Sequence, residues 1–206
     1  MKKIRTLIAD DHAIVRMGLS ALLEAEPDIE IVGEAEDGTE AVKMASRLRP
    51  DVVVMDLMMP VLDGIAATER IHAELPDTKV LILTTSASSD DLARALSAGA
   101  VGALLKSSAN DKLIAAIHTV ANSKRCVSSE ITEMIRKDPP ILDLTDRQRE
   151  ILGFITKGLT NQDIARQLGI REDSVKEHLY KVFNKIGAAN RAEAVAIALR
   201  KHLLKI

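Results

Sequence analysis

Short apolar runs alternate with helical patterns over the first 122 residues of the chain. The clearest run is residues 52–55, where three valines and a methionine follow one another. A continuous run of this kind, rich in β-branched residues, is typical of a strand buried on both faces of a parallel sheet. Strand-like segments, some of them interrupted by polar residues or glycine, occur at residues 4–9, 29–32, 80–83 and 101–105, and each is followed by apolar residues at helical spacing. The alternation predicts an α/β fold with a doubly wound, five-stranded parallel sheet and right-handed crossovers.

The pattern becomes purely helical from residue 144. Four helices are expected, and the first begins with Thr145 and Gln148 at the spacing of a capping box. Gly169 provides a turn between the second and third helices. Two helices joined by a short turn that contains glycine, within a basic segment, describe a helix-turn-helix. The second half of the chain is therefore predicted to be a small all-α domain of four helices.

Residues 123–143 differ from both flanking patterns. They begin with polar residues, leave room for one short helix over 131–135, and contain the helix-breaking sequence Asp138-Pro139-Pro140. We therefore expect a first domain over residues 1–122, a linker over residues 123–143 and a second domain over residues 144–206.

Four of the predicted strands in the first domain, at residues 4–9, 52–55, 80–83 and 101–105, are followed by polar or charged residues. These residues are Asp10, Asp11, Asp56, Thr84 and Lys106. The carboxyl ends of parallel strands lie side by side and commonly form the ligand site, so we expect these side chains to converge. Three close carboxylates need a counter-charge, which Lys106 and a hard divalent cation, Mg²⁺ above all, can supply. In such a site Asp56 could attack a phosphoryl group; the simpler alternative is an aspartate that caps a turn.

Charge is distributed unevenly along the chain. The net charge of −2 combines 12 Lys/Arg and 19 Asp/Glu in residues 1–123 with 16 and 11 in residues 124–206. The basic second part suggests nucleic acid as a partner. The single cysteine, Cys126, excludes an intrachain disulfide. No apolar run approaches the roughly 18 residues of a membrane span, and acidic residues interrupt the start of the chain, so we expect a cytoplasmic protein without membrane contact.

The expected third helix of the second domain, residues 172–186, has two different faces. Successive residues turn by about 100°, which places an apolar stripe on one side. The other side is polar and has cations at its shoulders, and it presents Lys176, Glu177, Tyr180, Lys181, Asn184 and Lys185. A helix in a DNA major groove needs polar groups towards the base edges and cations towards the phosphates. A solvated amphipathic helix would share the apolar stripe but does not require lysines on both shoulders.

The residues at the strand ends resemble a known motif. The pair Asp10-Asp11, the segment from Asp56 to Gly64 (DLMMPVLDG), Thr84 and Lys106 are similar to those of the receiver domain of two-component response regulators. The resemblance implies a flavodoxin-like fold in which Asp56 accepts phosphate, assisted by Thr84 and Lys106. It also implies that Mg²⁺ is the cofactor and that its ligands are Asp10, Asp11, Asp56 and the backbone carbonyl of Met58.

Residues 144–203 resemble a second family, the LuxR-type DNA-binding domain. The similar segments are Leu144-Thr145, GLTNQDIA from Gly158, SVKEH from Ser174 and NRAEA from Asn190. Together the two resemblances imply a NarL/FixJ-type response regulator. Such a protein is a phosphorylation-controlled transcription regulator with a sensor histidine kinase and double-stranded DNA as partners, and it forms a homodimer when phosphorylated. Four residues depart from the family patterns. Ala103 stands where many receivers have an aromatic switch residue, and Ser107 where many have proline. Arg171 occupies the usual Ser or Thr cap position of the recognition helix, and Glu177 puts a negative charge on its groove face.

Two other functions remain open at this point. Phosphatases and phosphotransferases also form an aspartyl phosphate with Mg²⁺, but they need a general acid and a substrate pocket, for which the sequence offers no clear candidate. The chain could also be a DNA-binding protein whose receiver is locked or independent of phosphorylation. Substitution of Asp56 separates the three: an enzyme loses turnover, a regulator loses switching, and a locked receiver loses nothing.

Overall fold

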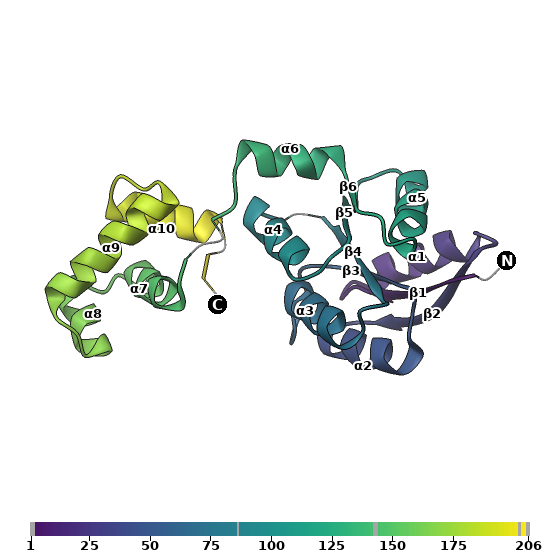
Figure 1. Cartoon of the computed structure of the whole chain (residues 1–206), viewed down its shortest axis with the longest axis horizontal. Helices are drawn as coiled ribbons and strands as arrows, with labels where there is room; N and C mark the ends of the chain where they lie inside the picture. The colour runs from purple at the N-terminus through teal and green to yellow at the C-terminus, as the bar shows by residue number, and fades with distance from the viewer. Residues whose placement is uncertain (1–2, 86, 142–143, 202, 205–206) are drawn as a thin grey trace. The chain divides into compact units, whose positions relative to one another are not determined.

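The computed structural model describes residues 3–85, 87–141, 144–201 and 203–204 (Figure 1). The chain forms two compact units, one of residues 1–87 and 91–138 and the other of residues 88–90 and 139–206. Within the described ranges, none of the helices has the length and apolar character needed to traverse a bilayer.

A parallel sheet forms the centre of the first unit. Its strands are β1 (Ile4–Ala9), β2 (Ile29–Ala35), β3 (Val52–Met55), β4 (Lys79–Thr84), β5 (Gly102–Leu105) and β6 (Cys126–Val127). Their order is β2-β1-β3-β4-β5-β6, and every neighbouring pair is parallel. The reversal of strand order beside β1 is the mark of a doubly wound sheet, and it confirms the predicted flavodoxin-like α/β architecture.

The sixth strand is an addition to the five that the sequence predicts. It pairs with β5 at only two positions, Gly102 with Cys126 and Ala103 with Val127. A strand of two residues has no apolar run or alternation that a sequence pattern could reveal. It lies within the segment expected to be a linker, which therefore begins as part of the sheet.

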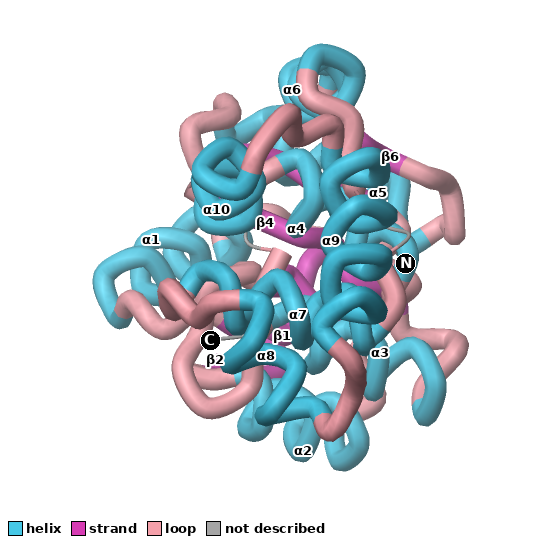
Figure 2. The backbone as a smooth tube through the Cα atoms, turned by 90° about the vertical axis from the view of Figure 1, so that its left-hand side faces the viewer, coloured by secondary structure: helices cyan, strands magenta, loops and turns pink. Residues whose placement is uncertain are grey.

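Helices cover both faces of the sheet (Figures 1 and 2). One core joins α1 (Ala13–Glu24) and α5 (Asn110–Ala121) to Val52 and Val54 of β3. The other core joins α2 (Gly38–Leu48), α3 (Gly64–Glu74) and α4 (Ser89–Ser97) to Val53 and Met55. Successive residues of a strand point to opposite faces, so all four residues of β3 are buried. This double burial explains why β3 reads as a continuous apolar run.

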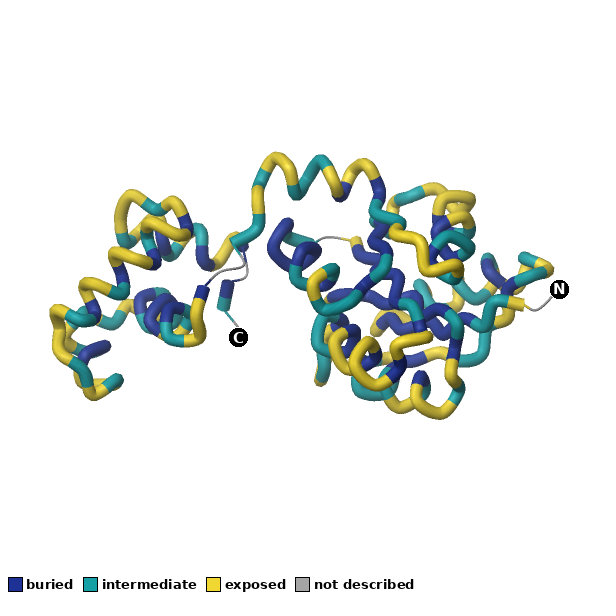
Figure 3. The backbone as a smooth tube through the Cα atoms, viewed as in Figure 1, coloured by how far each residue is buried: buried dark blue, intermediate teal, exposed yellow. Residues whose placement is uncertain are grey.

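Helix α6 (Ser129–Lys137) belongs to the first unit and is longer than the predicted helix. Ser128 caps it, because the backbone N–H of Ile131 donates to Ser128 Oγ at 3.3 Å. Ile131 is fully buried in the same core as Ala103, and Figure 3 shows buried positions along the start of this helix. Residues 142 and 143, at the end of the expected linker, lie outside the described residues.

The described residues of the second unit form four helices, as the sequence predicts. They are α7 (Asp146–Thr156), α8 (Asn161–Leu168), α9 (Glu172–Ile186) and α10 (Arg191–Arg200). Thr145 and Thr160 each form a capping box at the start of a helix. Gly169 and Gly187 end α8 and α9 in the left-handed conformation, with φ of 62° and 72°. A residue with a Cβ is strained at these φ values, which explains glycine at both turns.

Candidate functional site

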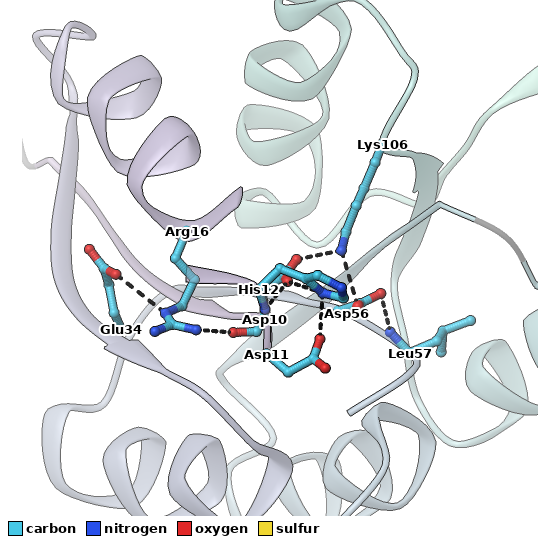
Figure 4. A network of polar contacts seen from close by, with 8 residues as sticks. All are labelled: Asp10, Asp11, His12, Arg16, Glu34, Asp56, Leu57 and Lys106. Atoms are coloured by element: carbon cyan, nitrogen blue, oxygen red, sulfur yellow. Dashed lines mark hydrogen bonds and ion pairs between the residues drawn. The ribbon is translucent and has the colours of Figure 1, made fainter. Parts of the chain in front are cut away.

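The ends of β1, β3 and β5 bring acidic and basic side chains together. Asp10 follows β1 and Asp56 follows β3, and the backbone N–H of Asp56 donates to the carbonyl of Ala9 at 2.8 Å. Lys106 follows β5, and its own N–H donates to the carbonyl of Thr84, the last residue of β4, at 2.7 Å. The charged residues Asp10, Asp11, Asp56 and Lys106 therefore converge, as the parallel arrangement requires (Figure 4).

Lys106 lies between two buried carboxylates. Its Nζ is 2.5 Å from Asp10 Oδ2 and 3.0 Å from Asp56 Oδ2. Burial raises the pKa of Asp56, and the hydrogen bond from Lys106 opposes this only in part. Burial alone would lower the pKa of Lys106, but its hydrogen bonds to Asp10 and Asp56 outweigh that effect and raise it. Lys106 is thus held as an ammonium ion beside a carboxylate that burial makes costly to ionise.

Asp11 and His12 complete the acidic cluster on its solvent side. One ligand atom from each of Asp10, Asp11, His12 and Asp56 can be chosen so that all four lie within 4.8 Å of one another. Asp11 and His12 are exposed, and His12 Nδ1 is 2.7 Å from Asp11 Oδ1. The three carboxylates offer the hard oxygen donors that Mg²⁺ prefers, so the donor set fits the cation that the sequence suggests. His12 was not predicted in this cluster; its position directly after the acidic pair is the one indication that the sequence offers.

The loop from Asp56 to Gly64 is shaped by two of its residues. A Cβ on Gly64 would lie 2.0 Å from the carbonyl oxygen of Asp56, so only glycine fits at this position. Asp63 caps α3 by accepting a hydrogen bond from the N–H of Ala66 at 2.7 Å. Met58 is 58% exposed. The loop thus presents Met58 at the surface while it keeps Asp56 buried.

Thr84 is fully buried at the end of β4. Its backbone carbonyl, which accepts from the N–H of Lys106, ties it directly to the neighbouring strand end. A buried hydroxyl in this position is adjacent to the acidic cluster in the order of the sheet, because β4 lies between β3 and β5.

Helix α9 presents the predicted polar face. It buries Val175, Leu179, Val182 and Ile186. The six predicted DNA-facing residues, Lys176, Glu177, Tyr180, Lys181, Asn184 and Lys185, are all exposed. Its N-cap, Arg171, makes no side-chain capping bond, as the departure from a Ser or Thr cap suggests.

Two of the lysines on this face are paired with acidic residues one helical turn away. Lys181 Nζ is 2.6 Å from Glu177 Oε1, and this hydrogen bond lowers the pKa of Glu177. Lys176 Nζ is 3.1 Å from Asp173 Oδ1. Exposed pairs of this type are weak, so they leave the lysines available for stronger partners.

Two family models match the chain. The response regulator receiver domain matches residues 6–118, and the luxR family of bacterial regulatory proteins matches residues 142–198. The transcriptional regulatory protein LiaR of Bacillus subtilis is 39% identical over 209 residues, which cover 98% of this chain and 99% of LiaR. The oxygen regulatory protein NreC of Staphylococcus epidermidis is 36% identical over 98% of this chain and 100% of NreC.

Solved structures give the same picture. The response regulator ChrA of a heme-sensing two-component system is 35% identical over 99% of this chain and 100% of ChrA, with a TM-score of 0.60. A structure of two RcsB dimers bound to two parallel DNAs is 25% identical over 97% of this chain and 99% of RcsB, with a TM-score of 0.70.

Proposed function

This chain belongs to the response regulators of the NarL/FixJ type, and from that premise we propose that Asp56 is its phosphorylation site and α9 its DNA-reading helix. Members of this family are transcription regulators that join a receiver to a LuxR-type DNA-binding domain, and control by phosphorylation is typical of them. The phosphoryl donor would be a sensor histidine kinase, and the phosphorylated chain would bind double-stranded DNA as a homodimer. We assign the receiver to residues 1–122 and the DNA-binding domain to residues 144–206.

The position of Lys106 is the observation that supports Asp56 best. An oxygen of the Asp56 carboxylate forms a bond to phosphorus while the bond from phosphorus to the donor nitrogen breaks, and the donor keeps that electron pair. Negative charge on the phosphoryl oxygens is then met by the Lys106 ammonium, which is already directed at Asp56 from 3.0 Å. The buried Thr84 hydroxyl lies at the adjacent strand end and would bond to a phosphoryl oxygen.

We infer that the acidic cluster binds Mg²⁺. We assign the ligands of Mg²⁺ to the carboxylates of Asp10, Asp11 and Asp56 and to the backbone carbonyl of Met58. When bound, Mg²⁺ neutralises charge on the carboxylates and on the transferring phosphoryl group. Without a cation, Lys106 is the counter-charge that Asp10 and Asp56 share.

The polar face of α9 is suited to a major groove. Lys176, Lys181 and Lys185 would contact phosphates, whereas Glu177 and Asn184 lie where base edges would be read. Tyr180, which is 68% exposed, adds a ring with a hydroxyl at the same face.

Phosphorylation of Asp56 can be tested by intact mass. The full chain is incubated with acetyl phosphate and Mg²⁺, and we expect a mass increase of one phosphoryl group that is absent in Asp56→Ala and in excess EDTA. Asp77→Ala, which replaces an exposed aspartate in the turn before β4, is the matched control and should be phosphorylated normally. An adduct that persists in Asp56→Ala contradicts the assignment.

DNA binding measured on the same samples separates the alternatives. A regulator binds its sites more tightly after phosphorylation, and Asp56→Ala abolishes that change. Equal DNA binding by phosphorylated and unphosphorylated chain would instead identify a locked receiver. Catalytic turnover of a phosphorylated substrate that depends on Asp56 would identify an enzyme.

A further inference from the structure

We propose that Arg16 is a positioning residue for the divalent cation: it fixes the turn that carries Asp10 and Asp11 and thereby strengthens Mg²⁺ binding. The proposal rests on the proposed function, because it assumes that this acidic cluster holds the cation. Arg16 lies on α1, outside the group of residues at the strand ends.

Arg16 satisfies a backbone group at the point where the sheet ends. The ladders of β1 with β2 and β3 end at Ala9, and the N–H of Asp10 still donates to Ala35 on β2 at 3.1 Å. The carbonyl of Asp10 accepts a hydrogen bond from Arg16 Nη1 at 2.6 Å (Figure 4). Helical side chains point back towards the helix N-terminus, which lets a residue in the first turns of α1 reach the strand before it.

This contact constrains both members of the acidic pair. The carbonyl of Asp10 and the N–H of Asp11 belong to one planar peptide group, so fixing the carbonyl also orients the backbone that carries Asp11. The Asp10 side chain is held separately, with Oδ1 accepting from the N–H of His12 at 2.9 Å and Oδ2 paired with Lys106. Arg16 therefore controls the part of the turn that these two contacts leave free.

Arg16 is itself held in place by β2. Its Nε is 3.6 Å from Glu34 Oε2, and Glu34 Oε1 accepts a hydrogen bond from Ser20 Oγ at 2.6 Å. The Arg16 side chain is only 16% exposed. A guanidinium can serve the Asp10 carbonyl and the Glu34 carboxylate at once because its donors form a rigid fork, whereas a lysine ammonium is a single point of charge.

The direction in which Mg²⁺ affinity changes when Arg16 is removed distinguishes a positioning role from simple charge repulsion. As a nearby positive charge, Arg16 would repel a divalent cation, and its removal would tighten Mg²⁺ binding. As a positioning residue it keeps the ligands in place, and its removal would weaken Mg²⁺ binding. Partners of metal ligands typically change metal affinity by about 10- to 100-fold when they are substituted.

The experiment is a calorimetric titration of the unphosphorylated full chain with Mg²⁺ at constant ionic strength. We expect Arg16→Met to bind Mg²⁺ about 10-fold more weakly than the wild type. Arg5→Met is the matched control, because Arg5 Nη1 also donates to a backbone carbonyl, that of Arg49 at 2.9 Å, but from the opposite end of β1. Arg5→Met should leave the Mg²⁺ affinity unchanged.

A second measurement distinguishes an effect of the substitution on Mg²⁺ affinity from an effect on the phosphoryl transfer itself. The rate of phosphorylation by acetyl phosphate is recorded at rising Mg²⁺, and Arg16→Met should need more Mg²⁺ but reach the wild-type rate at saturation. Unchanged or tighter Mg²⁺ binding, or a rate that stays low at saturation, overturns the proposal. If Arg16→Met does not fold, Arg16→Lys decides by the same criteria, with weaker binding expected. A wild-type chain that binds no Mg²⁺ and takes no phosphate contradicts the proposed function instead.

Discussion

Among the individual residues, Asp56 combines burial with a negative charge. Its side chain is 5% exposed, and burial raises its pKa above the ordinary value of 3.8. A raised folded-state pKa means that the folded protein holds this proton more tightly than the unfolded chain does. Asp56 therefore contributes stability below its unfolded pKa and loses that contribution as the pH rises through the folded pKa.

Asp56→Asn should consequently stabilise the metal-free protein at neutral pH. We expect the free energy of unfolding to rise by about 1 kcal/mol, an ordinary size for a single substitution. The difference from the wild type should shrink as the pH falls below the pKa of Asp56. Urea unfolding in EDTA at several pH values measures this. A variant that is less stable than the wild type at neutral pH would show that Lys106 compensates the charge of Asp56 completely.

Met58 is predicted to prolong the life of the phosphorylated state. It lies two residues after Asp56, where a polar side chain could orient a water for attack on the aspartyl phosphate, and its thioether is too weak an acceptor to do so. Met58→Asn should shorten the lifetime several-fold, measured by the decay of phosphoprotein after the phosphodonor is removed. Val61→Asn adds the same amide at an 85% exposed neighbour and should have no effect. An equal or longer lifetime in Met58→Asn contradicts the prediction.

The sequence predicts some residues of the site better than others. Asp10, Asp56 and Lys106 could be placed because each follows an apolar run, and parallel strands end together. Arg16 could not, because an arginine on an amphipathic helix is normally solvated and only the fold shows the Asp10 carbonyl within its reach. His12 was missed for a similar reason, since its nearness to Asp11 depends on the conformation of the turn.

At the scale of elements, α6 lies within the expected linker and packs Ile131 into the core of the first unit. Ile131→Ala should lower the free energy of unfolding by about 2–4 kcal/mol, because it leaves a cavity in a packed core. Arg136→Ala, on the same helix with a 73% exposed side chain, should change it by less than about 0.5 kcal/mol. Both changes in the free energy of unfolding can be measured by denaturing the full chain and monitoring hydrogen exchange of the amides in the sheet. Equal effects of the two substitutions would show that α6 is a linker only.

Elements with a repeated or continuous apolar pattern were predictable, and elements without one were not. The four apolar residues of β3 and the periodic stripe of α9 each carry a repeated pattern that identifies the element. β6 has two residues, and its pairing with Gly102 and Ala103 depends on the chain returning to β5 after α5. The single buried residue Ile131 likewise gives no periodicity, so the sequence could suggest a helix there but not where it packs.

At the scale of the whole molecule, Glu177 and Lys176 should affect DNA recognition differently. A carboxylate that accepts from a cytosine amine is worth about 1–3 kcal/mol of discrimination, compared with about 0.3–0.5 kcal/mol for its helix pair with Lys181. Glu177→Ala should therefore tighten binding to random DNA and relax the preference at one position of each half-site. Lys176→Ala should weaken binding to all sequences alike. It should also reduce, by about one, the magnitude of the slope of the logarithm of the binding constant against the logarithm of the salt concentration.

Binding to a series of sites with single-base substitutions, at two salt concentrations, measures both effects. If Glu177→Ala leaves the ratios of affinity between the substituted sites and the original site unchanged, Glu177 is only a surface charge. A change in sequence preference in Lys176→Ala would mean that this lysine contacts a base.

The exposed ring of Tyr180 can also serve as an intrinsic fluorescent probe of α9. The chain contains one tyrosine and no tryptophan, so its intrinsic fluorescence comes from a single ring. That ring lies on the face of α9 assigned to DNA and is 68% exposed. Stacking or burial of the ring against DNA would change its emission, whereas phosphate chemistry in the receiver would change it only by altering α9. The two domains can therefore be distinguished spectroscopically in the unlabelled chain.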